Sequence, residues 1–211
     1  ALTRDRAGSE MTELGLLRDA GAIGFTDCDQ VMVNNKVLTR CLTYAASLDM
    51  LVQGHPQDIT LSAGASATSG KFASLRGLPS VNAIAETIGV QRDLAIVELT
   101  GVKYHFDQLS TSRALDPLKL AKRDGLDVTA GASIHHLTLN EMDIGDYRTF
   151  FKIKPPLRSE DDRLAMVEAV ADGTIDIISS MHTPQGEESR RLPFEEAASG
   201  AVRLETIFPA S

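Results

Sequence analysis

The amino-acid sequence predicts an α/β fold built from parallel strands. Short apolar segments typical of buried strands alternate with helical segments through most of the 211 residues. Such alternation is typical of parallel strands joined by crossover helices, in either a doubly wound sheet or a β/α barrel. Histidines closely follow three of the expected strands: His55, the pair His135 and His136, and His182. Because barrels carry their chemistry at the carboxyl ends of their strands, this placement is a first indication of a functional site.

The first half of the chain contains two expected strands and two expected helices. The apolar run Ala22–Thr26 predicts a buried strand, and Met50–Gln53 predicts a second one. Apolar residues three and four positions apart predict a helix from about Lys36 to Leu48, with Cys41 on its buried face. A long helix is expected over Val81–Thr100, begun by Ser80 and ended by Gly101.

The second half continues the alternation. A helix capped by Ser110 or Ser112 is expected to end at Gly125. Ser159 begins another helix, whose acidic first residues suit the positive end of the helix dipole. The remaining expected elements are strands at Lys103–Leu109, Leu126–Ala130 and Ile175–Ser179, and a closing helix from about Phe194 to Ile207. Two long connections are expected to be loops: Ser62–Leu78 and Pro184–Leu192.

Composition and charge exclude several classes of function. The formal net charge of −8, from 21 basic and 29 acidic residues, argues against a nucleic acid or an anionic membrane as partner. No apolar run approaches the ~20 residues that span a bilayer, and the start Ala1–Arg6 lacks the pattern of a signal peptide. Cys28 and Cys41 are therefore expected to be reduced in the cytoplasm. No linker is evident, so residues 1–211 are expected to form one domain.

Five short motifs lie in order along the chain, at or near the expected strand ends. They are Val52-Gln53-Gly54-His55, Tyr104-His105-Phe106-Asp107-Gln108-Leu109-Ser110-Thr111, Ser133-Ile134-His135-His136-Leu137, Pro155-Pro156-Leu157-Arg158, and Ser180-Met181-His182-Thr183-Pro184-Gln185. Together they resemble dihydroorotases of the class allied to aspartate carbamoyltransferase, within the amidohydrolase superfamily. Dihydropyrimidinases and allantoinases are more distant relatives.

The resemblance implies a (β/α)8 TIM-type barrel of the metal-dependent hydrolase kind. In this chain it covers only the part from about strand 4 to strand 8. The strand with the family's His-x-His metal pair and the C-terminal tail have no counterpart in the chain. Because five strands cannot close an eight-stranded barrel, we expect a longer protein or a partner to complete it. The implied chemistry is zinc-dependent: the metal polarises the ring amide and activates a water, and an aspartate takes the proton as carbamoyl aspartate and dihydroorotate interconvert.

Most of the implied site positions carry other residues in this chain. One histidine ligand matches His55, and the other falls on Gln108. The bridging carboxylate falls on Cys28, next to Asp27, and the catalytic aspartate falls on Met181. The substrate-binding asparagine and histidine fall on Lys154 and Gln185 respectively. No catalytic residue is therefore assigned, and the remaining metal candidates are His55, Asp27 and Cys28.

Each candidate has an ordinary structural alternative. Lys154, Arg158, Gln185 and His135 are the substrate-binding candidates, but solvated charge, a tied-down loop or packing explains them equally well. The leading hypothesis is a dihydroorotase-like protein of pyrimidine biosynthesis that is impaired or inactive. It would then act as a scaffold that holds aspartate carbamoyltransferase or another partner in an assembly, and the chain itself is expected to form a homo-oligomer.

Two other readings stay open. One is an active zinc-dependent dihydroorotase or related cyclic amidohydrolase, with a rearranged site that uses Asp27, His55 and His182. The other is a module that binds an anionic ligand through Lys154 and Arg158 without turnover.

Overall fold

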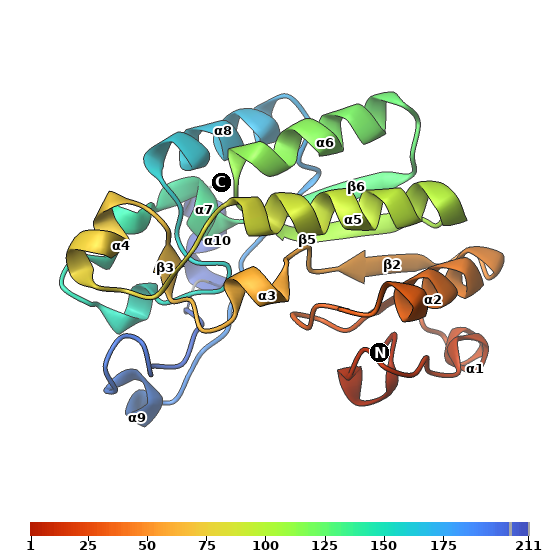
Figure 1. Ribbon diagram of the computed structural model, residues 1–211, viewed down its shortest axis with the longest axis horizontal. Coiled ribbons are helices and arrows are strands. Elements are labelled where there is room, and N and C mark those ends of the chain that lie inside the picture. Colours follow the sequence, from red (N-terminus) through yellow and green to blue (C-terminus); the bar gives the residue numbers. More distant parts are fainter. Residues whose placement is uncertain (203, 211) are drawn as a thin grey trace.

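A computed structural model describes residues 1–202 and 204–210 of the chain. Its main sheet has five parallel strands, and their order in the sheet follows their order in the sequence (Figure 1). A doubly wound sheet would reverse its strand order at a switch point, whereas a barrel adds each strand next to the previous one. The expected barrel-type α/β fold is therefore confirmed. The strands are β1 Gly24–Thr26, β2 Leu51–Gly54, β5 Tyr104–Leu109, β6 Val128–Ser133 and β7 Ile177–Ser179.

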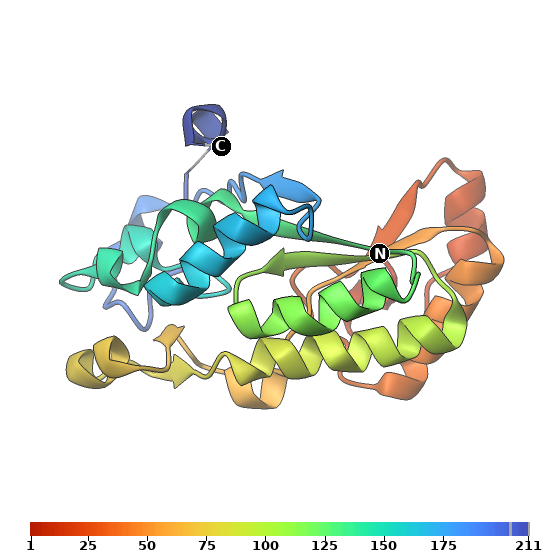
Figure 2. The ribbon, with the colours of Figure 1, turned by 90° about the horizontal axis from the view of Figure 1, so that it is seen from above.

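Four longer helices cover one face of this sheet: α2 Asn35–Ser47, α5 Ile84–Thr100, α6 Ser112–Arg123 and α8 Glu160–Ala171. Each contacts the next in chain order, and Figure 2 shows α5 and α6 lying along the sheet. Alternate strand side chains point into this helical layer. Val52 is buried there while its neighbour Leu51 is 39% exposed on the other face. Strand side chains such as Phe25, Val52 and Phe106 and helical residues such as Cys41 and Leu118 share one hydrophobic core.

Shorter elements complete the described residues. A two-stranded parallel sheet pairs β3 Ala67–Thr68 with β4 Ser80–Val81. The remaining elements are η1 Arg4–Arg6, α1 Leu14–Asp19, α3 Ile59–Ser62, α4 Lys71–Arg76, α7 Ile134–Thr138, η2 Glu141–Ile144, η3 Thr149–Phe151, α9 Glu187–Arg190, η4 Leu204–Thr206 and α10 Ile207–Ala210. Among the described residues, no helix has both the length and the apolar character needed to cross a membrane.

The expected start of α8 and the expected end of α5 are confirmed, whereas the expected serine cap of α6 is wrong, because Thr111 precedes that helix and its side chain makes no capping hydrogen bond. The Ser159 hydroxyl accepts a hydrogen bond from the Asp162 backbone N–H at 3.1 Å and caps α8. Gly101 ends α5 with φ of 66°, in the left-handed region that favours glycine. Cys41 is fully buried in the core, and burial raises the pKa of its thiol to about 11.

Several expected boundaries were wrong. The long helix begins at Ile84, because Ser80–Val81 pairs with β3 instead of starting a turn. The closing helix does not form: the chain turns at 194–196, and η4 and α10 cover only 204–210, while Arg203 lies outside the described residues. Both expected loops contain helices, α4 in Ser62–Leu78 and α9 in Pro184–Leu192.

Candidate functional site

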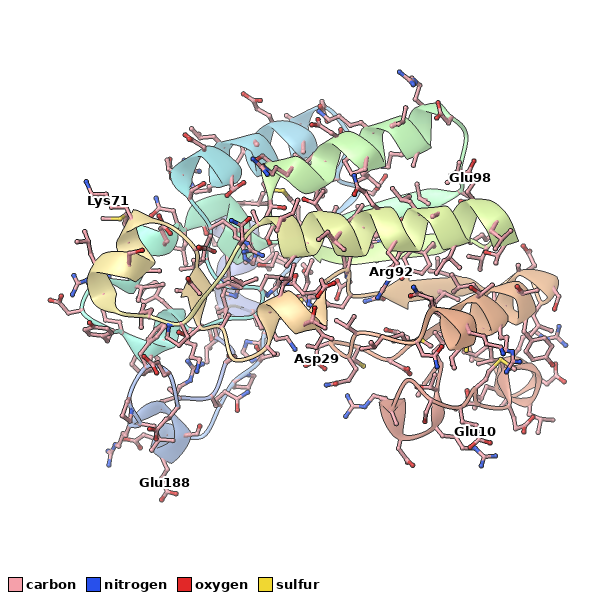
Figure 3. All side chains as sticks on the ribbon, viewed as in Figure 1. Glu10, Asp29, Lys71, Arg92, Glu98 and Glu188 are labelled. Carbon is pink, nitrogen blue, oxygen red and sulfur yellow. The ribbon has the colours of Figure 1, made fainter. Side chains whose placement is uncertain are left out.

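A cavity of about 430 Å³ opens at the carboxyl ends of the five parallel strands; we call it the main cavity. Every strand of the sheet contributes to it, as a barrel site requires. Asp29, labelled in Figure 3, lies at its rim. The part of the lining at the strand ends is Thr26 on β1 and Cys28 after it, Gln53 on β2, Asp107 and Gln108 on β5, Ser133 on β6, and Met181 after β7.

Three of these residues have an unusual backbone. Cys28, Gln108 and Met181 adopt positive φ angles of 59°, 56° and 45°. Side chains other than glycine rarely occupy this region, and holding one there costs on the order of 1–3 kcal/mol. Gln108 also lies where the pairing register between β5 and β6 shifts, between Phe106 and Leu109. The strand ends are thus sharply bent around the main cavity.

The side chains at these bends offer little for hydrolysis. The Gln108 amide donates to Asp107 Oδ2 at 2.9 Å. Met181 presents a thioether, which cannot take a proton at neutral pH and is a poor ligand for a hard metal. Cys28 is exposed, and its backbone N–H donates to Thr26 Oγ1 at 2.9 Å. The polar groups of this part of the site mostly hydrogen-bond to their neighbours.

His136 is the histidine that reaches the main cavity. It is buried, with Nδ1 3.0 Å from Ser133 Oγ and Nε2 3.3 Å from the Pro156 carbonyl oxygen. Nε2 must donate to that carbonyl, so Nδ1 accepts from the serine hydroxyl. Burial and the nearby Arg158 cation lower the pKa of His136 to about 4. The ring is therefore neutral at pH 7 and is held by two partners.

Asp27, Cys28 and His55, the three metal candidates, do not form a three-ligand group among the described residues. The Asp27 carboxylate accepts hydrogen bonds from the Leu2 and Thr3 backbone N–H groups, both at 2.9 Å, and from the Thr3 hydroxyl. It therefore fastens the N-terminal segment and lies outside the lining of the main cavity. His55 is buried, and burial followed by the Lys154 charge lowers its pKa. It lines two smaller cavities, one of about 240 Å³ and one of about 20 Å³ that it shares with Asp27.

The zinc that the resemblance implies does not fit the side chains described. Zinc needs three or four nitrogen, sulfur or carboxylate ligands converging on one point. Within residues 1–202 and 204–210, no three His, Cys, Asp or Glu side chains are grouped in that way.

The substrate-binding candidates divide into two groups. Lys154 and Gln185 do line the main cavity. The Lys154 ammonium lies 3.7 Å from Asp29 Oδ2 and donates to the Asp29 carbonyl at 3.4 Å, while Gln185 Nε2 donates to the Ser199 carbonyl at 3.1 Å. His135 is buried in α7, where its neighbour His136 takes the place at the cavity.

Arg158 does not reach the main cavity, and its contacts agree with the alternative of a residue that ties down its loop. Its side chain is 2% exposed and lies 3.4 Å from Glu86 Oε2, inside the protein. It also donates to Ser110 Oγ at 3.0 Å and to Thr68 Oγ1 at 3.3 Å. A guanidinium with these partners is not available to an anion in the main cavity.

Sequence reasoning missed Asp29, Gln53, Ser133 and Thr183, which all line the main cavity. The signal for Gln53 was available: in a strand, a residue next to the buried Val52 must face the opposite side. Ser133 is the last residue of β6 and so also lies at the carboxyl end of a strand. His182 follows β7 as expected, and its Nδ1 accepts from the Leu204 backbone N–H at 3.2 Å.

Comparisons with known proteins agree with the fold. Residues 1–114, slightly more than half of the chain, match the model of a family described as dihydro-orotase-like. A dihydroorotase of Anaplasma phagocytophilum is 39% identical over 207 residues, which is 98% of this chain and 46% of that protein. One from Listeria innocua is 38% identical over 99% of this chain and 49% of its own length. The chain thus spans about half the length of the curated relatives it matches.

Solved structures share the fold at lower sequence identity. An L-hydantoinase (dihydropyrimidinase) from Arthrobacter aurescens superposes with a TM-score of 0.79 and 22% identity, covering 92% of this chain and 46% of its own. A dihydroorotase from Campylobacter jejuni gives a TM-score of 0.65 and 15% identity, over 92% of this chain and 52% of its own.

Proposed function

The chain belongs to the dihydroorotase-like family, and on that premise we propose that it serves pyrimidine biosynthesis as a structural subunit with little or no hydrolase activity of its own. A structural subunit acts through the surface that contacts its partner, and its cavity does not have to catalyse a reaction. Its expected partner is aspartate carbamoyltransferase. We infer separately that the chain itself forms a homo-oligomer. We also propose a cytoplasmic location, because free cysteines such as Cys28 and Cys41 stay reduced there.

The chemistry of the strand ends is the observation that carries this proposal. A thiol, an amide and a thioether occupy the three bent positions Cys28, Gln108 and Met181. Metal-assisted ring opening needs a held cation and a general base, and none of these side chains is a general base at pH 7. The nearby Asp107 accepts from the Gln108 amide, and Lys154 faces Asp29.

The two other readings have weaker support. An active enzyme with a rearranged site would need Asp27, but three donors from Leu2 and Thr3 already hold that carboxylate. An anion-binding module would need Arg158, which pairs with Glu86 in the interior.

The test uses the complete gene product, purified without chelators, with and without the aspartate carbamoyltransferase of the same organism. Zinc is measured by inductively coupled plasma mass spectrometry, and ring opening of dihydroorotate is followed in parallel with a dihydroorotase of known activity. We expect substoichiometric zinc, no ring opening above background, and co-elution with the carbamoyltransferase on a sizing column.

Two results would overturn the proposal. The first is stoichiometric zinc with rapid ring opening that chelation removes. The second is a carbamoyltransferase whose size and activity are the same with and without this protein.

A further inference from the structure

A hollow of about 460 Å³ lies between three segments at the protein surface; we call it the Tyr147 hollow. Leu78 follows α4, Tyr147 lies between η2 and η3, and residues 193–196 follow α9. Figure 1 shows α4 and α9 at the end of the molecule opposite α1. The lining residues of the hollow are all different from those of the main cavity, so this is a separate place in the fold.

Tyr147 lines this hollow from a strained backbone. Its φ of 58° lies in the left-handed region, where a bulky residue is an outlier. The residue is 44% exposed, although two contacts hold it: its hydroxyl donates to the Arg76 carbonyl at 2.8 Å, and the Arg76 guanidinium lies 5.6 Å from the ring centre. Backbone outliers cluster at ligand clamps and other functional sites. An exposed aromatic ring held in this way therefore indicates a contact surface.

The rest of the hollow combines apolar and acidic residues. Leu78 and Phe194 are buried and belong to one hydrophobic cluster. Glu195 and Glu196 are exposed, and in the described part of the chain neither carboxylate forms an ion pair or accepts a hydrogen bond. Lys152 Nζ donates to the backbone carbonyl of Glu195 and leaves its carboxylate to the solvent. The hollow thus offers an aromatic ring, an apolar floor and two free negative charges.

These features are complementary to an arginine side chain. A guanidinium stacks on aromatic rings and pairs with carboxylates, and the aliphatic stem behind it packs on apolar surface. A lysine ammonium pairs with the same carboxylates but does not stack in this way. The volume falls within the roughly 300–1,000 Å³ of sites for small molecules. It therefore has room for one such side chain and part of the segment that carries it.

The surroundings of the hollow are acidic. Glu187 and Glu188 lie on α9, and Figure 3 shows Glu188 at the outer edge of the molecule. The arginines beside them are engaged, because Arg190 is buried and Arg191 pairs with Glu187. A surface of this charge steers a positively charged segment toward it.

We propose that the Tyr147 hollow is the docking site for a basic segment of a partner protein. An arginine of that segment lies against the Tyr147 ring and pairs with the carboxylates of Glu195 and Glu196. This inference rests on the proposed function, since it names the surface through which a structural subunit acts. A small organic cation and a second copy of this chain are the competing occupants.

The first test measures binding of fluorescein-labelled octa-arginine to the full chain by fluorescence anisotropy at low salt. Any acidic protein attracts this peptide, so two variants with the same change in net charge are compared. Glu195→Gln/Glu196→Gln should weaken binding about five-fold, the effect of two lost exposed ion pairs. Glu187→Gln/Glu188→Gln is the matched control, because both glutamates lie outside the hollow, and it should weaken binding less than about two-fold.

A second comparison tests the aromatic wall. Octa-lysine should bind about three-fold more weakly than octa-arginine, because only the guanidinium stacks on the ring. This difference should shrink in Tyr147→Leu. Phe150→Leu is the matched control: Phe150 is 70% exposed but lies outside the hollow, so its loss should leave the difference unchanged.

A third test uses the complete gene product and the aspartate carbamoyltransferase of the same organism. Glu195→Gln/Glu196→Gln should abolish co-elution on a sizing column, and Glu187→Gln/Glu188→Gln should keep it. If the unaltered protein does not co-elute, the proposed function fails, and the peptide comparison alone then decides whether the hollow binds arginine.

Four results would overturn the docking site. Two are equal weakening of octa-arginine binding in both double variants, and co-elution that both double variants retain. The third is displacement of octa-arginine by an equal concentration of free arginine, which would make the hollow a small-molecule site. The fourth is a lower oligomeric state of Glu195→Gln/Glu196→Gln on its own, which would make the occupant a second copy of this chain.

Discussion

Replacing Arg158 by methionine tests how much the buried ion pair between Arg158 and Glu86 contributes to the free energy of unfolding. Arg158 and Glu86 are 2% and 1% exposed at their side chains. Besides Arg158, the Glu86 carboxylate accepts from the Ser110 backbone N–H at 2.9 Å, from the Ser110 hydroxyl, and from the Thr111 N–H and hydroxyl at 2.9 and 2.8 Å. The Thr68 hydroxyl, a further Arg158 partner, donates to the Leu157 carbonyl at 2.8 Å. The pair therefore joins α5, the β5–α6 junction, β3 and the Pro155–Arg158 segment.

The magnitude follows from the partners that remain after the substitution. Removing one member of a buried ion pair costs roughly 3–5 kcal/mol, because the other charge is left buried and uncompensated. Glu86 keeps its four donors from Ser110 and Thr111, which places Arg158→Met at the low end, about 3 kcal/mol. With a urea m-value of about 2 kcal/mol/M, the unfolding midpoint should fall by roughly 1.5 M.

The assay is urea unfolding followed by far-UV circular dichroism, with tyrosine fluorescence as a second probe. Arg191→Met is the matched control: it removes an arginine from an exposed i,i+4 pair with Glu187, whose side chains are 74% and 78% exposed. That change should cost less than about 0.5 kcal/mol. In Glu86→Gln combined with Arg158→Met, the losses should fall short of additivity, because no lone charge stays buried. If Arg158→Met unfolds at the same urea concentration as Arg191→Met, the reasoning is refuted.

Three further changes probe the backbone and the pH response. Gly89→Ala should destabilise the protein by about 1–3 kcal/mol in spite of alanine's better helix propensity, since its Cβ would lie 2.4 Å from the Gln57 backbone nitrogen; thermal unfolding checks this. Met181→Ile should lower the free energy of unfolding by about 1 kcal/mol more than Met181→Gly, because a β-branched residue tolerates φ of 45° poorly; parallel urea melts compare the two. His136 has a folded pKa of about 4, below its ordinary value, so the unfolded state binds more protons between pH 4 and 6.5. Its stabilising effect is therefore complete above that range and is lost as pH falls through it, up to about 3 kcal/mol, and His136→Gln should flatten the stability–pH curve there.

The sequence predicted the sheet well because its signals are local. The strands were expected from short segments that contain apolar residues, such as Tyr104 and Phe106 in β5. Amphipathic periodicity identified α2, whose Leu38, Cys41 and Leu42 are buried as expected. The prediction of the closing helix failed because the structure of this segment depends on contacts from other parts of the chain. Phe194, Ala197 and Ala201 have helical spacing and are all buried, but they pack from an irregular segment. Its backbone is satisfied from elsewhere: Lys152 Nζ donates to the Glu195 carbonyl, and Arg190 donates to the Gly200 carbonyl.

The sequence predicted where the site lies better than it predicted which residues contact one another there. The resemblance to the family pointed to Cys28, Gln108, Lys154, Met181 and Gln185, and all of them line the main cavity. The role of Arg158 depends on Ser110, Glu86 and Thr68, which lie 48, 72 and 90 residues away in sequence. No local pattern records contacts over such separations, so only the folded arrangement distinguishes an interior arginine from one at the cavity mouth.

The bend at Gln108 is explained by hydrogen bonds within the fold and requires no role of this residue in a reaction. The register shift between Phe106 and Leu109 lies just before Ser110 and Thr111, whose N–H groups both reach Glu86 at 2.9 Å. The positive φ of Gln108 thus has a structural reason, because it turns the chain toward the buried ion pair. Backbone strain at a strand end often indicates a catalytic residue. At Gln108, the hydrogen bonds that Ser110 and Thr111 make to Glu86 offset the cost of the strain, so no catalytic role is needed to explain it. These hydrogen bonds come from the backbone and hydroxyl groups of Ser110 and Thr111, so the bend does not depend on which side chain faces the cavity at Gln108.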